Sequence, residues 1–126
     1  MDVLNGIFGV HEKAMILRQR RLALLGQNIA NADTPYYKSK DIDFKKIMAK
    51  ETDFSVKLSQ PGHMNRTSSR NPALIYRTPN NPAADGNTVE LNYEQAQFGK
   101  ESARYTATLQ FLENRIGGIR RALRGE

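Results

Sequence analysis

The chain has 126 residues, 39% of them hydrophobic and 25% charged, a size and composition that predict one soluble, mostly ordered domain. It contains no cysteine, which excludes disulfides, zinc–thiolate sites and cysteine nucleophiles. The net charge of +6 favours anionic partners such as nucleic acid, an acidic membrane surface or an acidic protein. The first residues, MDVLNGIFGVHEK, do not resemble a secretory signal peptide, and no apolar run is long enough to predict a membrane span.

The first predicted element is a long amphipathic helix from about Phe8 to Ala32. Its apolar residues recur every seven positions in two neighbouring rows, which places them on one broad face. Those rows consist of Phe8, Met15, Leu22 and Ile29, with Leu25 beside them, and of Val10, Leu17 and Leu24. Arg18 falls off this face, so we expect it to be solvated. Pro35 ends the helix, because a residue before proline avoids the helical conformation.

The middle of the chain, residues 35–88, is predicted to be irregular. The piece FKKIMAKE is typical of a short helix, and SVKLS and ALIYR are typical of short strands. Residues from about 51 to 71 are rich in Ser, Asn and Pro, which favours an exposed, mobile loop. Residues 1–34, 35–88 and 89–126 are therefore expected to be an N-terminal helix with its turn, a middle segment and a C-terminal helix.

A second long helix is predicted to begin near Val89. Its apolar residues alternate at spacings of four and three, the pattern of a coiled-coil seam, although Gln95 and Ser102 make the upstream part polar. The seam consists of Leu91, Phe98, Tyr105, Leu109, Leu112, Ile116, Ile119 and Leu123. The expected fold is mostly α. Its two long terminal helices pack as a coiled-coil-like pair, parallel or antiparallel and within or between chains, around a small irregular or short-β excursion.

No group of residues in the sequence predicts an enzyme. His11 lies in the first helix and is expected to pack or to face solvent, and His63 lies in a polar loop. Asp41 and Asp43 lack further ligands at metal or acid–base spacing, so a solvated pair is favoured. We therefore expect no catalytic residue, no cofactor and no metal. The arginines of the C-terminal helix could contact phosphates, but a solvated helix face is favoured.

Two amides near the end of the first helix need an explanation, because Asn is a poor helix former. Asn28 and Asn31 lie three residues apart, on one side of the helix. They either hydrogen-bond backbone groups of a neighbouring element and fix its register, or belong to a frayed helix end that is rich in turn formers. The residues alone favour neither interpretation.

The stretch LLGQNIANADTPYYKSKDIDF resembles the N-terminal signature of the bacterial flagellar axial proteins, the rod and hook families, with its pattern S/N-N-I-A-N-A/S-x-T-P-x-Y. LSQPGHM resembles a further family segment. From YRTPNNPAADGNTV to the end, the chain is similar to the family's C-terminal half. KSKDIDF and the absence of an M-V-x-M-x-x-x-x-R-A-Y tail favour the proximal rod. Many members carry Gly or Asn where this chain has Tyr36, so we expect no positive-φ turn there.

The resemblance implies a structural subunit of the proximal rod of the flagellar basal body. Such a subunit is exported unfolded through the flagellar type III export apparatus, without a cleaved signal peptide, and polymerises in the periplasm. Its terminal helices build a helical tube that transmits torque and houses the export channel. The implied partners are further copies, FlgC-type and distal-rod proteins, basal adaptor or MS-ring components and the export gate, with no nucleic acid or small-molecule substrate.

The resemblance also implies which residues meet neighbouring subunits, with the amides of the IANADTP segment at a crowded junction. The expected assembly interface consists of Phe8, Met15, Leu22, Leu25, Asn28, Ile29, Asn31, Asp33, Thr34, Pro35, Tyr37, Leu91, Phe98, Tyr105, Leu109, Leu112, Ile116, Ile119 and Leu123. The alternative function is a small basic nucleic-acid-binding protein that dimerises through its helices. A steep salt dependence of DNA affinity would distinguish that alternative.

Overall fold

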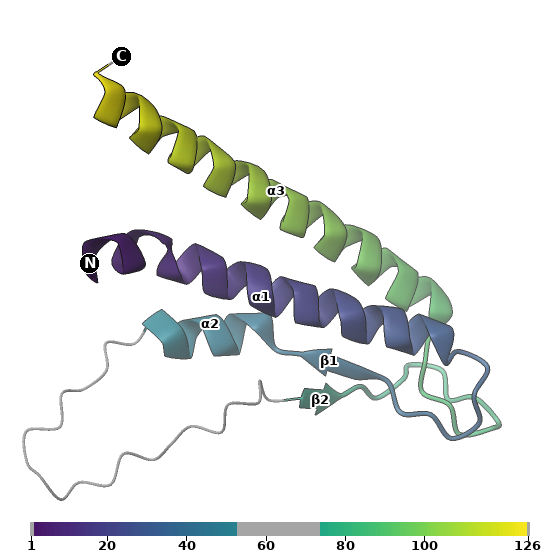
Figure 1. Cartoon of the computed structure of the whole chain (residues 1–126). Coiled ribbons are helices and arrows are strands. Elements are labelled where there is room, and N and C mark those ends of the chain that lie inside the picture. Colours follow the sequence, from purple (N-terminus) through teal and green to yellow (C-terminus); the bar gives the residue numbers. More distant parts are fainter. Residues whose placement is uncertain (1, 53–73, 126) are drawn as a thin grey trace, which may run out of the picture.

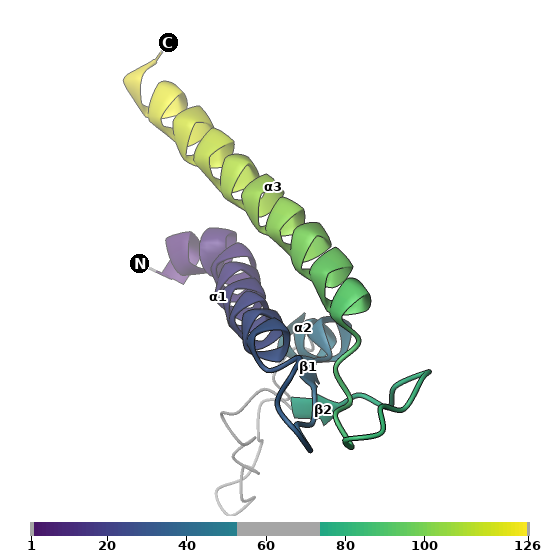
Figure 2. The ribbon, with the colours of Figure 1, turned by 90° about the vertical axis from the view of Figure 1, so that its right-hand side faces the viewer.

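The computed structural model describes residues 2–52 and 74–125. Two long helices, α1 (Asp2–Ala30) and α3 (Leu91–Arg124), run antiparallel to each other (Figure 1). They lie close together at the end that carries the connecting loops and separate toward the chain termini (Figures 1 and 2). The prediction of a mostly helical fold with a packed terminal pair is confirmed. None of the described helices is long and apolar enough to cross a membrane.

The middle segment forms a small structure along one side of α1. Strand β1 (Lys40–Ile42) pairs antiparallel with β2 (Leu74–Tyr76), with Asp41 opposite Ile75. Helix α2 (Phe44–Thr52) follows β1 and lies beside α1 (Figure 1). The short helix and the strand in ALIYR are confirmed, and β1 was not predicted. SVKLS, His63 and most of the expected loop lie outside the described residues.

Local sequence explains how these elements begin and end. The Asp43 carboxylate accepts a hydrogen bond from the backbone N–H of Lys46 at 3.0 Å, which makes Asp43 the N-cap of α2. Helix α1 ends at Ala30, two residues earlier than predicted. The chain then turns through Asn31 and Ala32, and Pro35 cannot continue a helix.

The interior of the described subunit is more polar than the predicted apolar seam. Its buried hydrophobic residues are Ala14, Leu17, Leu25 and Ile42. Its buried polar residues are more numerous: Asn28, Ser39, Asp41, Asn87, Glu94 and Glu101. Buried charges are stable only when they are paired and hydrogen-bonded, so polar contacts must hold the two helices in register.

Candidate functional site

Six charged residues form a continuous chain of ion pairs between α1, α3 and the strands, which we call the ionic network. Three carboxylates face three part-buried guanidinium groups, and the more exposed Arg104 lies 4.0 Å from Glu101 at the edge of the network. Its members are Arg18, Arg21, Asp41, Arg77, Glu94 and Glu101.

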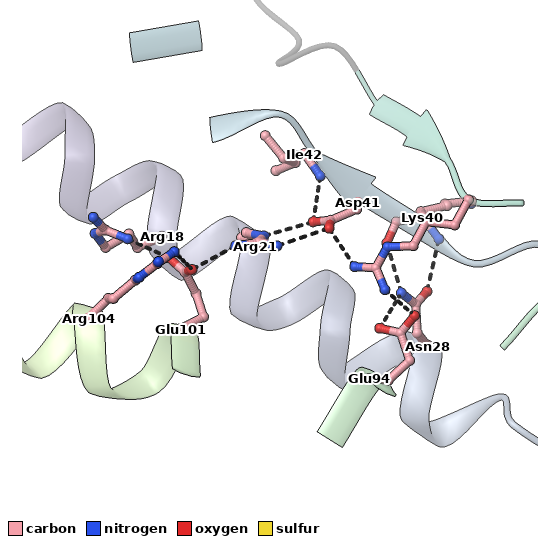
Figure 3. Close-up of polar contacts among 10 residues, drawn as sticks. Arg18, Arg21, Asn28, Lys40, Asp41, Ile42, Glu94, Glu101 and Arg104 are labelled. Atoms are coloured by element: carbon pink, nitrogen blue, oxygen red, sulfur yellow. Dashed lines mark hydrogen bonds and ion pairs between the residues drawn. The ribbon is translucent and has the colours of Figure 1, made fainter. Parts of the chain in front are cut away.

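Glu101 ties α3 to α1. Its side chain is only 1% exposed, and one carboxylate oxygen accepts from Arg18 Nη1 while the other accepts from Arg21 Nη1, both at 2.8 Å (Figure 3). Each oxygen therefore has a charged donor, which is the condition for burying a carboxylate without a large desolvation penalty. Both arginines lie on the same side of α1, three residues apart.

Asp41 ties the strand β1 into the same network. Arg21 donates to both carboxylate oxygens, through Nε at 2.9 Å and Nη2 at 3.1 Å, and Arg77 donates to Oδ2. The backbone N–H of Ile42 donates to Oδ1 at 2.7 Å. Burial alone would raise the pKa of Asp41, but these hydrogen bonds outweigh it and hold the pKa below its ordinary value. The same contact with Asp41 raises the pKa of Arg21.

Asn28 extends the network through neutral groups. Glu94 accepts from Arg77 Nη1 at 2.5 Å and from the Asn28 amide at 3.1 Å. Asn28 also donates to the backbone carbonyl of Lys40 at 2.8 Å and accepts from its N–H at 3.0 Å, as a neighbouring strand would (Figure 3). The Tyr37 hydroxyl donates to the same amide oxygen at 3.3 Å. Asn28 therefore joins α1 to both β1 and α3.

Asn31 has a different role. Its amide donates to the Gln27 carbonyl at 2.8 Å and its amide oxygen accepts from the Thr34 hydroxyl at 3.1 Å, which are local helix-end contacts. Each of the two interpretations that the sequence left open therefore applies to one of these two asparagines. Asn28 fixes the register of another element and Asn31 belongs to the turn. Asn28 hydrogen-bonds the backbone of its own chain, whereas the resemblance implied a contact with the backbone of a neighbouring subunit.

The structure overturns two expectations about charged residues. Asp41 is buried in the ionic network, although the sequence favoured a solvated carboxylate, and Arg18 is mostly buried against Glu101 instead of facing solvent. The inward-facing glutamates of α3 are Glu94 and Glu101. Each lies one residue before a polar seam position, Gln95 or Ser102. His11 packs as expected, with its ring centroid 4.9 Å from that of Phe111.

Acid is expected to weaken this network. Because the folded-state pKa of Asp41 lies below its ordinary value of 3.8, its stabilisation is fully present above the unfolded-state pKa and is lost as pH falls through the folded-state pKa. Asp41→Asn should therefore show a smaller fall in unfolding free energy than the parent chain on acidification. Urea unfolding across the acidic range measures this, and parallel pH profiles for the two proteins would contradict it.

The loops at the close end of the helix pair are held together by Asn87. We call residues 31–39 and 83–90 the junction. The Asn87 side-chain N–H₂ group points at three backbone carbonyls that follow α1, those of Asn31, Ala32 and Thr34, at 2.9, 2.9 and 2.8 Å. Its amide oxygen accepts from the N–H of Val89 at 2.7 Å. Asn87, a few residues before α3, thus holds the turn that follows α1, where backbone carbonyls outside the helix need donors.

Tyr36 adopts the positive φ that the sequence analysis did not expect, at +59°. The Tyr37 N–H donates to the Thr34 carbonyl at 3.3 Å, so Pro35 and Tyr36 occupy the centre of a turn with the type II pattern, in which the third residue has a positive φ. The Tyr36 N–H also donates to the Asp85 carbonyl at 3.1 Å. Tertiary contacts to the second half of the junction therefore outweigh the local preference of a tyrosine.

Gly86→Ala is expected to destabilise the subunit by about 1–2 kcal/mol or more, because Gly86 has φ +76° and the left-handed region is costly for a residue with a Cβ. The added methyl group would also lie 2.8 Å from Cδ1 of the Tyr36 ring. Thermal unfolding followed by circular dichroism measures this, with Gly99→Ala as a control at a helical position with open space. An unchanged unfolding temperature for Gly86→Ala would rule out this account of the junction.

The predicted interface residues divide into two groups. Leu25 and Asn28 are fully buried inside the subunit, so they stabilise its own fold and are left out of the interface proposed below. The rest are half-buried or exposed: Phe8, Met15, Leu22, Ile29, Asn31, Asp33, Thr34, Pro35, Tyr37, Leu91, Phe98, Tyr105, Leu109, Leu112, Ile116, Ile119 and Leu123. Among the residues that the structure describes, no group of three or more His, Cys, Asp or Glu side chains could hold a metal ion.

Comparison with known proteins places this helical pair and its junction in a class of structural proteins. The family described as flagella basal body rod protein matches residues 8–38, which include most of α1 and the first part of the junction. The resemblance inferred from the IANADTP signature is confirmed.

Full-length relatives specify the family further. The chain is 42% identical to the flagellar basal body rod protein FlgB of Cereibacter sphaeroides, over 94% of both chains. It is 35% identical to FlgB of Salmonella typhimurium, over 99% of this chain and 98% of the relative. It is also 35% identical to FlgB of Escherichia coli K12, over 98% and 96%. The chain therefore belongs to the FlgB family of flagellar basal body rod proteins. It is a structural subunit of the rod, and the nucleic-acid alternative is not supported.

Proposed function

We propose that this subunit polymerises with other rod proteins through the exposed apolar faces of α1 and α3. The observation that carries the proposal is the predicted seam of α3. Leu109 and Ile116 are 36% and 38% exposed and Leu123 is 83% exposed, although their spacing is that of an interhelical contact. Burial of a large apolar side chain is worth roughly 1.5–3 kcal/mol, so covering this seam would contribute substantially to assembly.

The shape of the subunit supports the same assignment. The helices separate toward the termini, so the second half of α3 has less of α1 to pack against than its first half (Figures 1 and 2). Val10 and Ile16 of α1 are also exposed, at 44% and 47%. Apolar surface therefore remains on both helices. In this proposal residues 1–34 and 89–126 form the assembling layer, and residues 35–88 brace it through β1 and Arg77.

The finer setting of the subunit follows from the family resemblance. The proposed location is the proximal rod in the periplasm, reached through the type III export apparatus without a cleaved signal peptide. The proposed neighbours are further copies, FlgC-type and distal-rod proteins, and components of the basal adaptor, MS ring and export gate. Their helices would complete a tube that houses the export channel, and an open repeating contact of unlike surfaces generates such a tube.

Leu112→Asp is expected to abolish motility by preventing incorporation into the rod while export continues, because a carboxylate cannot be buried there without a partner. Leu112 is half-buried in the subunit, so Leu123→Asp is the companion variant at a more exposed position. Asn114→Asp, an exposed change of the same charge, is the control. Immunoblots of purified basal bodies measure incorporation. Normal motility of both leucine variants would contradict the proposal.

A further inference from the structure

The last turns of α3 carry exposed cationic side chains that find no counter-charge within the described chain. Arg115, Arg120, Arg121 and Arg124 are exposed, and none forms an ion pair with another described residue. Ile116, Ile119 and Leu123 lie between them in sequence. This end of α3 therefore carries both aliphatic and strongly basic side chains, and the basic ones have no counter-charge within the described residues.

Two other arginines of this subunit, Arg18 and Arg77, show what chemistry these side chains can meet. Arg18 and Arg77 each pair with a buried carboxylate, and each also lies over an aromatic ring. The Arg18 guanidinium is 4.3 Å from the centroid of Phe44, and that of Arg77 is 4.8 Å from the centroid of Tyr93. Carboxylates and an aromatic face together are thus the complement that arginine favours.

The junction offers that complement at its surface. Tyr36 is 78% exposed, and one edge of its ring lies against Gly86, so most of the ring is accessible to a partner. Exposed carboxylates of Asp33 and Asp85 lie in the same two loops, and Pro35 adds apolar surface. Lys38 is an exposed cation in the junction, and its Nζ donates a hydrogen bond to the Gly86 carbonyl at 3.3 Å.

The two complementary surfaces lie at opposite ends of the subunit. The junction is at the end where α1 and α3 meet, and the C-terminus of α3 is at the far end (Figure 1). One subunit cannot bring them together, whereas two subunits placed end to end can. Contact between unlike ends also leaves a free end on each subunit, which allows the contact to repeat.

We propose that the last turns of α3 dock on the junction end of a second copy of this subunit in the rod, with arginines facing its aspartates and tyrosine ring and the aliphatic residues covering its proline. This inference rests on the proposed assembly and names the partner surface for one part of α3. The charge arrangement gives the contact a direction, because two basic helix ends repel each other.

Photo-crosslinking in assembled basal bodies tests the contact. Leu123 is replaced by p-benzoylphenylalanine, and cross-linked peptides are identified by mass spectrometry. The expected product joins the α3 end to a junction peptide, from residues 31–39 or 83–90, of a second copy of this subunit. The same probe at Gln110, on the exposed opposite side of α3, is the control and should not give that peptide. Cross-links from position 123 only to other regions would overturn the inference.

Charge reversal on α3 is the second experiment that tests the contact. Arg120→Glu combined with Arg121→Glu is expected to lower the yield of the junction cross-link about tenfold, as a loss of about 1.4 kcal/mol in affinity would. Lys45→Glu combined with Lys46→Glu makes the same charge change on α2 and should leave the yield unaltered. Equal yields in both double variants would also overturn the inference. If position 123 cross-links no rod subunit and Leu112→Asp is motile, the proposed assembly itself fails.

Discussion

Arg21→Met is expected to destabilise the folded subunit by about 3–5 kcal/mol, the range measured when one partner of a buried ion pair is removed. Arg21 is shared by two carboxylates, because Nε and Nη2 donate to Asp41 and Nη1 donates to Glu101. Methionine keeps most of the side-chain volume but leaves both acids short of a counter-charge. The remaining partners, Arg77 and Arg18, can compensate only in part.

Arg20→Met is the matched control for this prediction. Arg20 is the neighbouring residue on α1, it is exposed, and it has no ion pair with any described residue. Surface substitutions of this kind usually change stability by less than about 0.5 kcal/mol. Urea unfolding followed by far-ultraviolet circular dichroism compares the two variants. If they unfold at the same urea concentration, the ionic network does not hold α1 against α3.

The two long helices were predictable because helix formation depends on short-range spacing, whereas their antiparallel packing within one chain was left open. Apolar residues at intervals of three, four and seven define one side of a helix wherever they occur, so the start of α3 and the end of α1 were expected within about two residues, whereas α1 begins six residues before the predicted Phe8. The strand β2 was expected from ALIYR, since β-branched and aromatic residues favour strands. Strand β1 was missed because its three residues, Lys40 to Ile42, include two charged side chains.

The ionic network was not predictable in the same way. Charged residues are mostly exposed in folded proteins, so a carboxylate such as Asp41 is reasonably expected in solvent. Its burial depends on Arg77, which lies 36 residues away, and Glu101 and Arg18 are 83 residues apart. One sequence signal did exist: Glu94 and Glu101 are seven residues apart and recur with the seam, in the half of the helix where the polar residues Gln95 and Ser102 interrupt it.

Tyr36 shows how a local rule fails. A left-handed conformation costs a residue with a Cβ about 1–2 kcal/mol, which argued against a positive φ. The rule considers only the residue itself, whereas the turn is held by a backbone hydrogen bond to Asp85 and by packing of the ring on Gly86. Strained residues persist where the surroundings fix them, and such positions are frequent at functional surfaces.

The amides of the IANADTP segment give the other large expected effect. Asn28 is fully buried and uses its amide both as donor and as acceptor, so no isosteric side chain can replace it. Aspartate has the same shape but has no N–H to donate. In Asn28→Asp, a carboxylate oxygen would face both the Lys40 carbonyl at about 2.8 Å and the Glu94 carboxylate at about 3.1 Å, the distances now spanned by hydrogen bonds.

Asn28→Asp is therefore expected to lower the free energy of unfolding by about 3–5 kcal/mol at neutral pH, because it buries a charge beside a like charge. The new carboxyl should have a raised pKa in the folded state, so the deficit relative to the parent chain should shrink as pH falls and the group binds a proton. Asn31→Asp is the control. It follows the helix, and its hydrogen bond to the Gln27 carbonyl is exposed, so water can replace that donor and the change should cost only about 0.3–1 kcal/mol through the helix dipole. Urea unfolding at neutral and mildly acidic pH measures both variants, and equal losses for the two would show that Asn28 does not join the three elements.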